Sequence, residues 1–252
     1  MSTKRILVAA VAAMALGLSA RAQTNIQVFY DFGKDRQILT TTLEGFYNDN
    51  WGNTFFFIDY DYPLKDAFPA GTYFEFARCL NFWHGTFLEP LSIQVEYNGG
   101  VYNQYGINHA ALAGLDLFFH SRNFKNTFNL KALYKWISYK GQPDGFKSLV
   151  PMQFTAVWGF QDLFGLRGLR FCGFADFWWQ DHTLTYDEKG NTLNYPEKSR
   201  LVFLSEPQLW YSVGQFIGVP NFNIGGEVEL SYDFGSCRGF RARPCAGIKW
   251  VF

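Results

Sequence analysis

The chain has 252 residues, with 22 Lys and Arg against 22 Asp and Glu, so its formal net charge is zero. This balance, without any block of like charge, argues against nucleic acid as a partner. Aromatic residues make up 20% of the chain, yet the mean hydropathy is only −0.11, and no apolar run after Leu18 has the length of a membrane helix. This combination favours strands whose side chains alternate between lipid and water.

The N-terminus has the pattern of a secretory signal peptide. Lys4 and Arg5 form a positive start, residues 6–18 are apolar, and Ala20-Arg21-Ala22 is a small-x-small cleavage site. An apolar run of 13 residues is too short to span a hydrocarbon core, which needs about 20. We therefore expect 1–22 to be removed and 23–252 to form one domain. Its 19 basic and 22 acidic residues give a net charge of −3.

Segments with period-2 alternation, bounded by Gly, Pro, Asn and Asp, run through the rest of the chain. In 222–234, for example, the acids Glu227, Glu229 and Asp233 share one face of a strand, whereas a helix would scatter them. The segment 107–119 is ambiguous, because its Ala-rich centre also fits a short helix. The twelve segments are 24–33, 38–48, 53–62, 71–82, 90–98, 107–119, 127–139, 150–160, 168–180, 200–213, 222–234 and 241–252.

Twelve strands of this length predict an all-β fold, a transmembrane antiparallel up-and-down β-barrel in a bacterial outer membrane. An even strand number places both chain ends on the periplasmic side. The odd-numbered connections then face outward, and we expect the longest, 181–199, to be connection nine on that outer side.

The last residues match the closing strand of outer-membrane barrels. Gly247 lies sixth from the end, Trp250 third from the end, and Phe252 is terminal. The final strand must be recognised and paired by the insertion machinery, and a terminal aromatic anchors it at the interface. Cys245 departs from the pattern, because a polar residue is usual there. We expect the barrel to have this machinery and the lipids of the membrane as partners.

Alternation also divides the strands into a lipid face and a lumen face. In 53–62 the inward set is Phe55, Phe57, Asp59 and Asp61. Aromatic faces there can stack on a ring-bearing solute while carboxylates accept its hydroxyl or amino hydrogens. The alternative is that these groups simply solvate the interior. The other candidate solute-binding residues are Phe46, Tyr73, Glu75, Glu96, Asp176, Glu206, Glu227 and Glu229. Glu44, Gln94, Lys131, Lys135, Arg170 and Lys249 also fall inside.

Arg78 conflicts with this division, since it falls in phase with lipid-facing Phe74 and Phe76. Such a position costs about 2–4 kcal/mol near the bilayer midplane. A bulge after Phe76 or an interfacial position of Arg78 would each remove the conflict.

The opening strand 25–33, the chain length, the twelve segments, the aromatic and acidic lumen, and the closing Gly-x-x-Trp-x-Phe together resemble the nucleoside-specific channel-forming (Tsx-like) outer-membrane family. The resemblance is spread over the mature chain and has no single motif diagnostic of nucleosides. It implies a monomeric twelve-stranded barrel through which nucleosides diffuse.

Nothing in the sequence indicates catalysis, a metal site or a cofactor. The four histidines lie in different segments without metal-ligand spacing, and Ser121 directly follows His120, so in a strand they would point to opposite faces. Cys237 and Cys245 flank the last predicted loop, where an exported chain could form a disulfide.

The sequence thus supports a passive channel for small polar solutes, with nucleosides as the leading solute. A non-conducting structural or partner-binding barrel is favoured instead if Lys131, Lys135, Arg170 and Lys249 pair with the acids and close the lumen. An outer-membrane lipid hydrolase would require Ser and His side chains clustered on one wall.

Overall fold

The computed structural model describes residues 23–33, 36–65, 68–102 and 105–252. The signal peptide predicted at 1–22 therefore lies outside the described residues. Strands dominate, with two short 3₁₀ turns, η1 (Leu163–Gly165) and η2 (Val213–Ile217). No helix in the described part of the chain has the length and apolar character needed to cross a bilayer. The strands are β1 (Gln23–Asp31), β2 (Ile38–Asp49), β3 (Gly52–Pro63), β4 (Gly71–Leu80), β5 (Leu91–Tyr102), β6 (Tyr105–His120), β7 (Asn126–Ile137), β8 (Met152–Gln161), β9 (Leu169–Tyr186), β10 (Thr192–Ser205), β11 (Gln208–Tyr211), β12 (Phe222–Tyr232) and β13 (Phe240–Val251).

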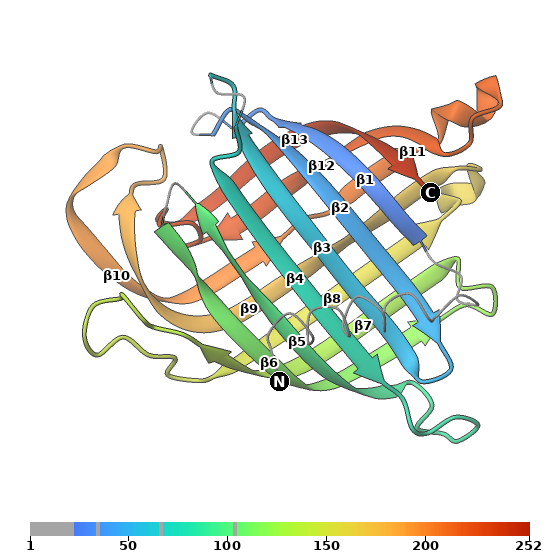
Figure 1. Cartoon of the computed structure of the whole chain (residues 1–252), viewed down its shortest axis with the longest axis horizontal. Coiled ribbons are helices and arrows are strands. Elements are labelled where there is room, and N and C mark those ends of the chain that lie inside the picture. The colour runs from blue at the N-terminus through green and yellow to red at the C-terminus, as the bar shows by residue number, and fades with distance from the viewer. Residues whose placement is uncertain (1–22, 34–35, 66–67, 103–104) are drawn as a thin grey trace, which may run out of the picture.

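These strands form a closed antiparallel barrel (Figure 1). Each pairs with its neighbours in chain order, except that β10 and β11 both pair with β9 and β12, and β13 pairs with both β12 and β1, which closes the ring. Every one of the twelve predicted segments is a strand, including 107–119, which belongs to β6 and is not a helix. Closure leaves no free sheet edge.

The segment predicted at 200–213 is divided into β10 and β11, but the two are one barrel strand. Ser205 pairs with Ala175 and Gln208 with Cys172, so the register against β9 is unchanged across the gap. The ladder breaks at Glu206 and Pro207 because proline has no N–H to donate. Opposite this gap Gly173 has φ +151, and a Cβ there would lie 2.3 Å from the Glu206 carbonyl oxygen. The barrel therefore has twelve strands, as predicted.

The prediction of a long loop at 181–199 is wrong. β9 continues to Tyr186 and β10 begins at Thr192, which leaves a tight turn at 187–191. The Asp187 side chain accepts hydrogen bonds from the N–H groups of Lys189 and Asn191 and closes this turn. The hairpin extends beyond the rest of the barrel at the left of Figure 1. Its β10 residues 192–198 are mostly exposed, so their polar composition resembled that of a loop.

The connections, numbered in chain order, lie alternately at two ends of the barrel, here named the odd end and the even end. Both ends of the described chain, Gln23 and Phe252, lie at the even end. Among the described connections 138–151, the seventh, is the longest and lies at the odd end. The even end has some long connections too, such as 81–90 and 212–221.

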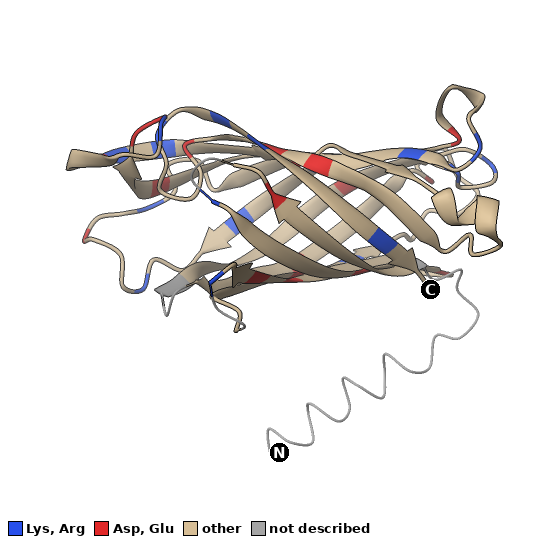
Figure 2. Ribbon diagram, turned by 90° about the horizontal axis from the view of Figure 1, so that it is seen from above, with Lys and Arg blue, Asp and Glu red and all other residues tan. Residues whose placement is uncertain are grey.

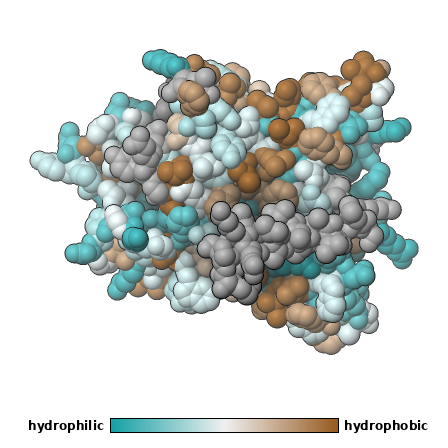
Figure 3. Space-filling view, in the orientation of Figure 1, coloured by the Kyte–Doolittle hydropathy of each residue, from teal (hydrophilic) through white to brown (hydrophobic). Residues whose placement is uncertain are grey.

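Side chains alternate between the two faces of the wall as the sequence predicted. In β1, Asn25, Gln27 and Phe29 are buried while Ile26 is exposed. Hydrophobic residues gather over the middle and right of the visible outer face in Figure 3, and the left end is largely hydrophilic. The interior contains mostly polar side chains together with small apolar clusters, one of which joins Ala110, Leu112 and Leu133.

Arg78 does lie on the outer face, but near its end. The registers of β4 with β3 and with β5 are continuous around it, so no bulge turns it inward. Its guanidinium pairs with Asp49 at 2.8 Å and donates to Thr54 Oγ1 at 3.0 Å, next to the β2–β3 turn. The bulge is therefore excluded, and the charge is paired at the barrel end, where the interfacial alternative requires it.

Candidate lumen site

Contacts between strands that are not neighbours define the lumen. The Phe46 ring of β2 lies 6.4 Å from the Phe118 ring of β6. The Phe29 ring of β1 lies 5.5 Å from Trp210 of β11. Side chains on the outer face diverge, so only inward-pointing groups can make such contacts across strands. Both contacts show that the side chains predicted to point inward lie in the lumen.

The predicted lumen residues come together on two walls. One wall comprises β2 to β5, and the other is formed by β9, the gap between β10 and β11, and β12. The walls are close enough for electrostatic interaction between Asp59 and Glu227, and between Glu75 and Asp176. The first wall holds Phe46, Phe55, Phe57, Asp59, Asp61, Tyr73, Glu75 and Glu96; the second holds Asp176, Glu206, Glu227 and Glu229.

An aromatic row lies on the first wall. The ring centroids of Phe55 and Phe57 are 5.9 Å apart, and that of Tyr73 is 5.8 Å from Phe57. The rings are tilted by 52° and 45°, so they present a continuous apolar surface with edges and faces toward the lumen. Phe55 and Phe57 share a face because they are two apart in β3, and Tyr73 joins them through its pairing opposite Asp59.

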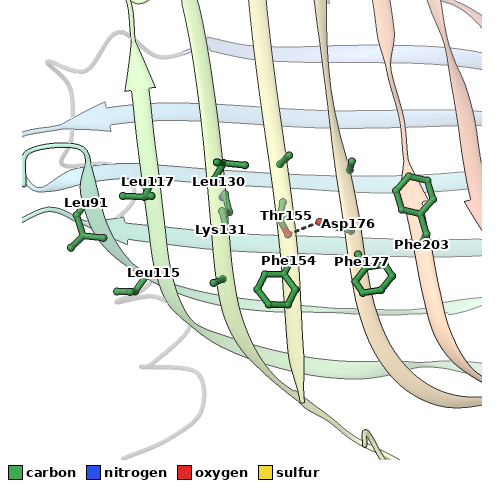
Figure 4. A pocket seen from close by; sticks show the side chains of 13 residues that line it. Leu91, Leu115, Leu117, Leu130, Lys131, Phe154, Thr155, Asp176, Phe177 and Phe203 are labelled. Carbon is green, nitrogen blue, oxygen red and sulfur yellow. Dashed lines mark hydrogen bonds between the residues drawn. The ribbon is translucent and has the colours of Figure 1, made fainter. Parts of the chain in front are cut away.

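Most lumen carboxylates accept a hydrogen bond from a neighbouring strand. Thr42 and Thr40 donate to Asp59 and Asp61 at 2.5 and 2.6 Å. Thr155 donates to Asp176, as Figure 4 shows, and Gln208 donates to Glu227 at 2.8 Å. Glu75 and Glu206 differ. Within the described parts of the chain, their side chains have no hydrogen-bond or ion-pair partner, so their oxygens can accept from a solute.

The lumen lysines do not neutralise these acids by direct pairing. Lys131 donates to Gln94 Oε1 at 2.7 Å, and Lys135 donates to Gln153 Oε1 at 2.6 Å. Lys135 also lies 4.1 Å from the Trp178 ring centre, and Lys249 lies 4.3 Å from that of Trp210. Among the residues that the structure describes, neither these lysines nor Arg170 forms an ion pair. The pairing that would have favoured a closed lumen is not found at these four residues.

A buried ion-pair network at the odd end was not predicted. Arg36 of the first connection pairs with Asp31 at 2.5 Å and with Glu229 at 2.9 Å. Arg243 pairs with the other oxygen of Glu229. Arg243 has the same phase in its strand as Lys249, so its inward direction could have been read from the sequence. Arg36 lies in a connection, where alternation carries no information, and only the fold brings it to Glu229.

Access to water is uneven along the lumen. Gln27, Gln94 and Asp116 are completely buried, so much of the interior is filled by packed side chains. By contrast, Phe55, Phe57, Asp59, Glu206 and Glu227 keep partial access to water. These five residues combine two rings of the aromatic row with Asp59 on the same wall and with two carboxylates of the facing wall. We refer to them below as the aromatic–acid tract.

Cysteine and histidine side chains supply no reactive centre. All four cysteines are free, so the disulfide predicted between Cys237 and Cys245 is not formed. Their sulfur atoms instead contact Arg243 and backbone oxygens. The described His ring nitrogens contact backbone oxygens or the Tyr97 hydroxyl, with no Ser hydroxyl among their partners. No cluster of potential metal ligands occurs in the described ranges.

A second concave feature lies on the outside of the wall and is distinct from the lumen. It is a hollow of about 540 Å³ over β5 to β10. Ala132, Ala156 and Ala175 are among its lining residues, and Leu115, Leu130, Phe154 and Phe177 are among the larger side chains around it (Figure 4). Its lining is mostly apolar, as a lipid-facing surface requires, and two of its three polar residues, Thr155 and Asp176, are hydrogen-bonded to each other.

A closed wall of strands with an apolar outer face and a polar interior defines a porin-like β-barrel. The NanC porin has this fold, with a TM-score of 0.51 and 9% identity, over 91% of this chain and 98% of that one. Omp33, an outer membrane protein of Acinetobacter baumannii, aligns with a TM-score of 0.38 and 12% identity over 94% and 100%. Residues 22–252 match a family model described as a domain of unknown function, DUF5020. The chain belongs to that family. No curated protein matches it in sequence.

Proposed function

We propose that this protein is a passive channel of the bacterial outer membrane for small polar solutes, with nucleosides as the leading solutes. The observation that carries the proposal is the aromatic–acid tract, the part of the lumen wall that water still reaches. Aromatic rings can stack on the flat ring of a solute, and carboxylates accept hydrogen bonds from its hydroxyl or amino groups. A base joined to a sugar offers both features. The fold shared with the NanC porin supports the channel, and nucleosides rest on the tract and on the Tsx-like resemblance.

The closing strand adds a proposal about assembly. Gly247 faces Phe29 so closely that a Cβ would lie 2.8 Å from its ring, while Trp250 pairs with Ile26 of β1. Phe252 is exposed, and its N–H donates to the Thr24 carbonyl. We infer that Trp250 and Phe252 form the signal read by the insertion machinery before the barrel closes. Deleting Phe252 should lower the folded fraction in cells more than in detergent refolding; equal losses would contradict this role.

Solute flux tests the channel directly. The mature protein would be reconstituted in liposomes, and entry of nucleosides would be compared with that of sugars of similar mass. Phe55→Ala and Asp59→Asn should each reduce the preference for nucleosides. Phe56→Ala is the matched control, because Phe56 is the neighbour of Phe55 in β3 and points outward.

The outcomes separate three conclusions. Nucleoside preference that is lost in the two lumen variants and kept in Phe56→Ala supports the proposal. Flux without a preference would support a channel but would contradict nucleosides as its leading solutes. No flux above protein-free liposomes would favour a non-conducting structural or partner-binding barrel, the second candidate, which the buried network of Arg36, Glu229 and Arg243 at the odd end supports.

A further inference from the structure

Large apolar side chains project from the connections at the even end. Phe87 is 91% exposed and Phe164 is 88% exposed, and both lie in connections rather than on the wall. Leu166, Phe216 and Ile217 are also more than half exposed. We name these five residues the apolar collar. Exposed side chains of this size are costly in water when they gather, and they indicate a contact surface.

The collar surrounds the barrel instead of marking one side of it. Its residues come from the β4–β5, β8–β9 and β11–β12 connections, which spread around the right-hand end of Figure 1. Trp51 in the β2–β3 turn and Phe124 in the β6–β7 connection are exposed as well. Every even connection therefore presents an apolar ring or chain. A protein partner would contact one side of the barrel, whereas a membrane surface meets the whole perimeter.

Backbone geometry gives an independent indication that the rings are held outward. Phe164 and Phe124 have φ angles of 55° and 56°, in the left-handed region that residues other than glycine rarely adopt. The 162–168 connection is nevertheless fixed, because Asp162 accepts from the Gly168 N–H at 2.8 Å and from Lys125 at 2.7 Å. The Phe124 ring stacks on His120 at 3.8 Å, whereas the Phe164 ring is exposed and makes no ring contact within the described residues, so its strained backbone stabilises nothing inside the protein. Its benefit must come from what lies outside.

Two of the five connections at the even end carry no charge. The connections 50–51 and 212–221 contain no charged residue. The latter, with η2, is the uncharged coil at the right of Figure 2 and a hydrophobic part of the upper right of Figure 3. At the odd end, by contrast, Arg238 forms ion pairs with Glu188 and Glu197, both at 2.9 Å. The uncharged connections 50–51 and 212–221 therefore suit an apolar medium, and Lys125 and Asp162 at the even end pair with each other at 2.7 Å.

The collar continues the apolar outer wall, so the same medium can cover both. Exposed Arg122 and Arg167 lie in the same even connections, where a guanidinium can bind a lipid phosphate while its stem remains apolar. Aromatic residues at strand ends are common at membrane interfaces. The collar differs because it lies beyond the strands, in the connections themselves.

We propose that the apolar collar inserts into the phospholipid interface of the leaflet at the even end, so that the connections anchor the barrel in the membrane. The surface has one kind of partner, phospholipid with its acyl chains against Phe87, Phe164 and Phe216 and its phosphates near Arg122 and Arg167. This anchoring does not depend on whether the lumen conducts.

Photocrosslinking in vesicles tests the proposal. p-Benzoylphenylalanine would replace Phe87, Phe164 or Phe216, one at a time, in the full mature barrel. The vesicles would contain phosphatidylethanolamine and phosphatidylglycerol, with an alkyne-tagged fraction of the former. The same probe at Phe154 on the outer wall is the positive control, and at Tyr195, which is 82% exposed on the β9–β10 hairpin, the negative one. Heat-modifiable gel mobility confirms that each barrel is folded.

We expect lipid adducts at the three collar positions in yields like that at Phe154 and several-fold above that at Tyr195. Adducts at Phe154 with only the Tyr195 level at the collar would overturn the proposal, because the collar would then face water. Barrel-to-barrel adducts in place of lipid adducts would also overturn it and would identify a second copy as the partner.

Discussion

Introducing an arginine at Leu130 probes whether the outer wall meets lipid. Leu130 lies near the middle of β7, points outward and borders the outer hollow. Its neighbours across the two adjoining strands are Leu117 and Ala156. A guanidinium placed there has no acid beside it on the outer face and must leave water for the apolar part of the bilayer.

The expected loss of unfolding free energy depends on how deep the arginine lies in the bilayer. Relative to Leu130→Ala, Leu130→Arg should lower the free energy of unfolding by about 2–4 kcal/mol, the range for Arg at the midplane of a barrel wall. This corresponds to roughly 30- to 1000-fold in the folding equilibrium, at about 1.4 kcal/mol per tenfold. The matched control is Phe240, an exposed outward residue at the start of β13. At that position, replacement by Arg should lower the free energy of unfolding by only about 0–1 kcal/mol relative to replacement by Ala.

The measurement is reversible folding into phospholipid vesicles, followed by tryptophan fluorescence and gel mobility across a denaturant series. The difference between Arg and Ala at 130 is compared with the same difference at 240. Equal costs at the two positions would refute the reasoning, since depth in a bilayer would then have no influence on the outer wall.

Three further predictions concern the lumen and one even connection. Leu133 is completely buried beside Leu112, so its replacement by alanine should lower the free energy of unfolding of the protein by about 2–5 kcal/mol. A smaller loss in the same folding assay would indicate that water fills the site. Lumen acids without paired cations should make the channel cation-selective, so a reversal potential in a KCl gradient should have the cation sign and shrink in Glu75→Gln/Glu206→Gln; an anion sign would contradict the charge assignment. Hydrogen bonds from Lys125 and from the Gly168 N–H lower the pKa of Asp162 from 3.8 to about 2, so its stabilising effect is present above pH 4 and lost as pH falls toward 2. The difference in denaturation midpoint between the wild type and Asp162→Asn should therefore diminish over that interval; a constant difference would show that protonation of Asp162 is not its cause.

Alternation determined the wall of this protein. Twelve segments with period 2 gave the strand number, and phase alone placed Phe55, Asp59 and Glu227 inward, because successive side chains of a strand point to opposite faces. Arg243 was predictable by the same argument from its phase with Lys249. The method failed in 181–199, since residues 192–198 of β10 are mostly exposed and do not alternate in burial.

Only the tertiary structure decided which inward groups meet one another. The sequence could not show that Lys131 and Lys135 bind amide oxygens instead of acids, or that Arg36 reaches Glu229, because these partners are set by closure of the barrel. Nor could it show that Cys237 and Cys245 remain apart as thiols. The collar likewise required the fold, since its five residues lie in three separate connections that come together only when the strands close. Local periodicity fixes the direction of a side chain, but long-range pairing fixes what lies opposite it.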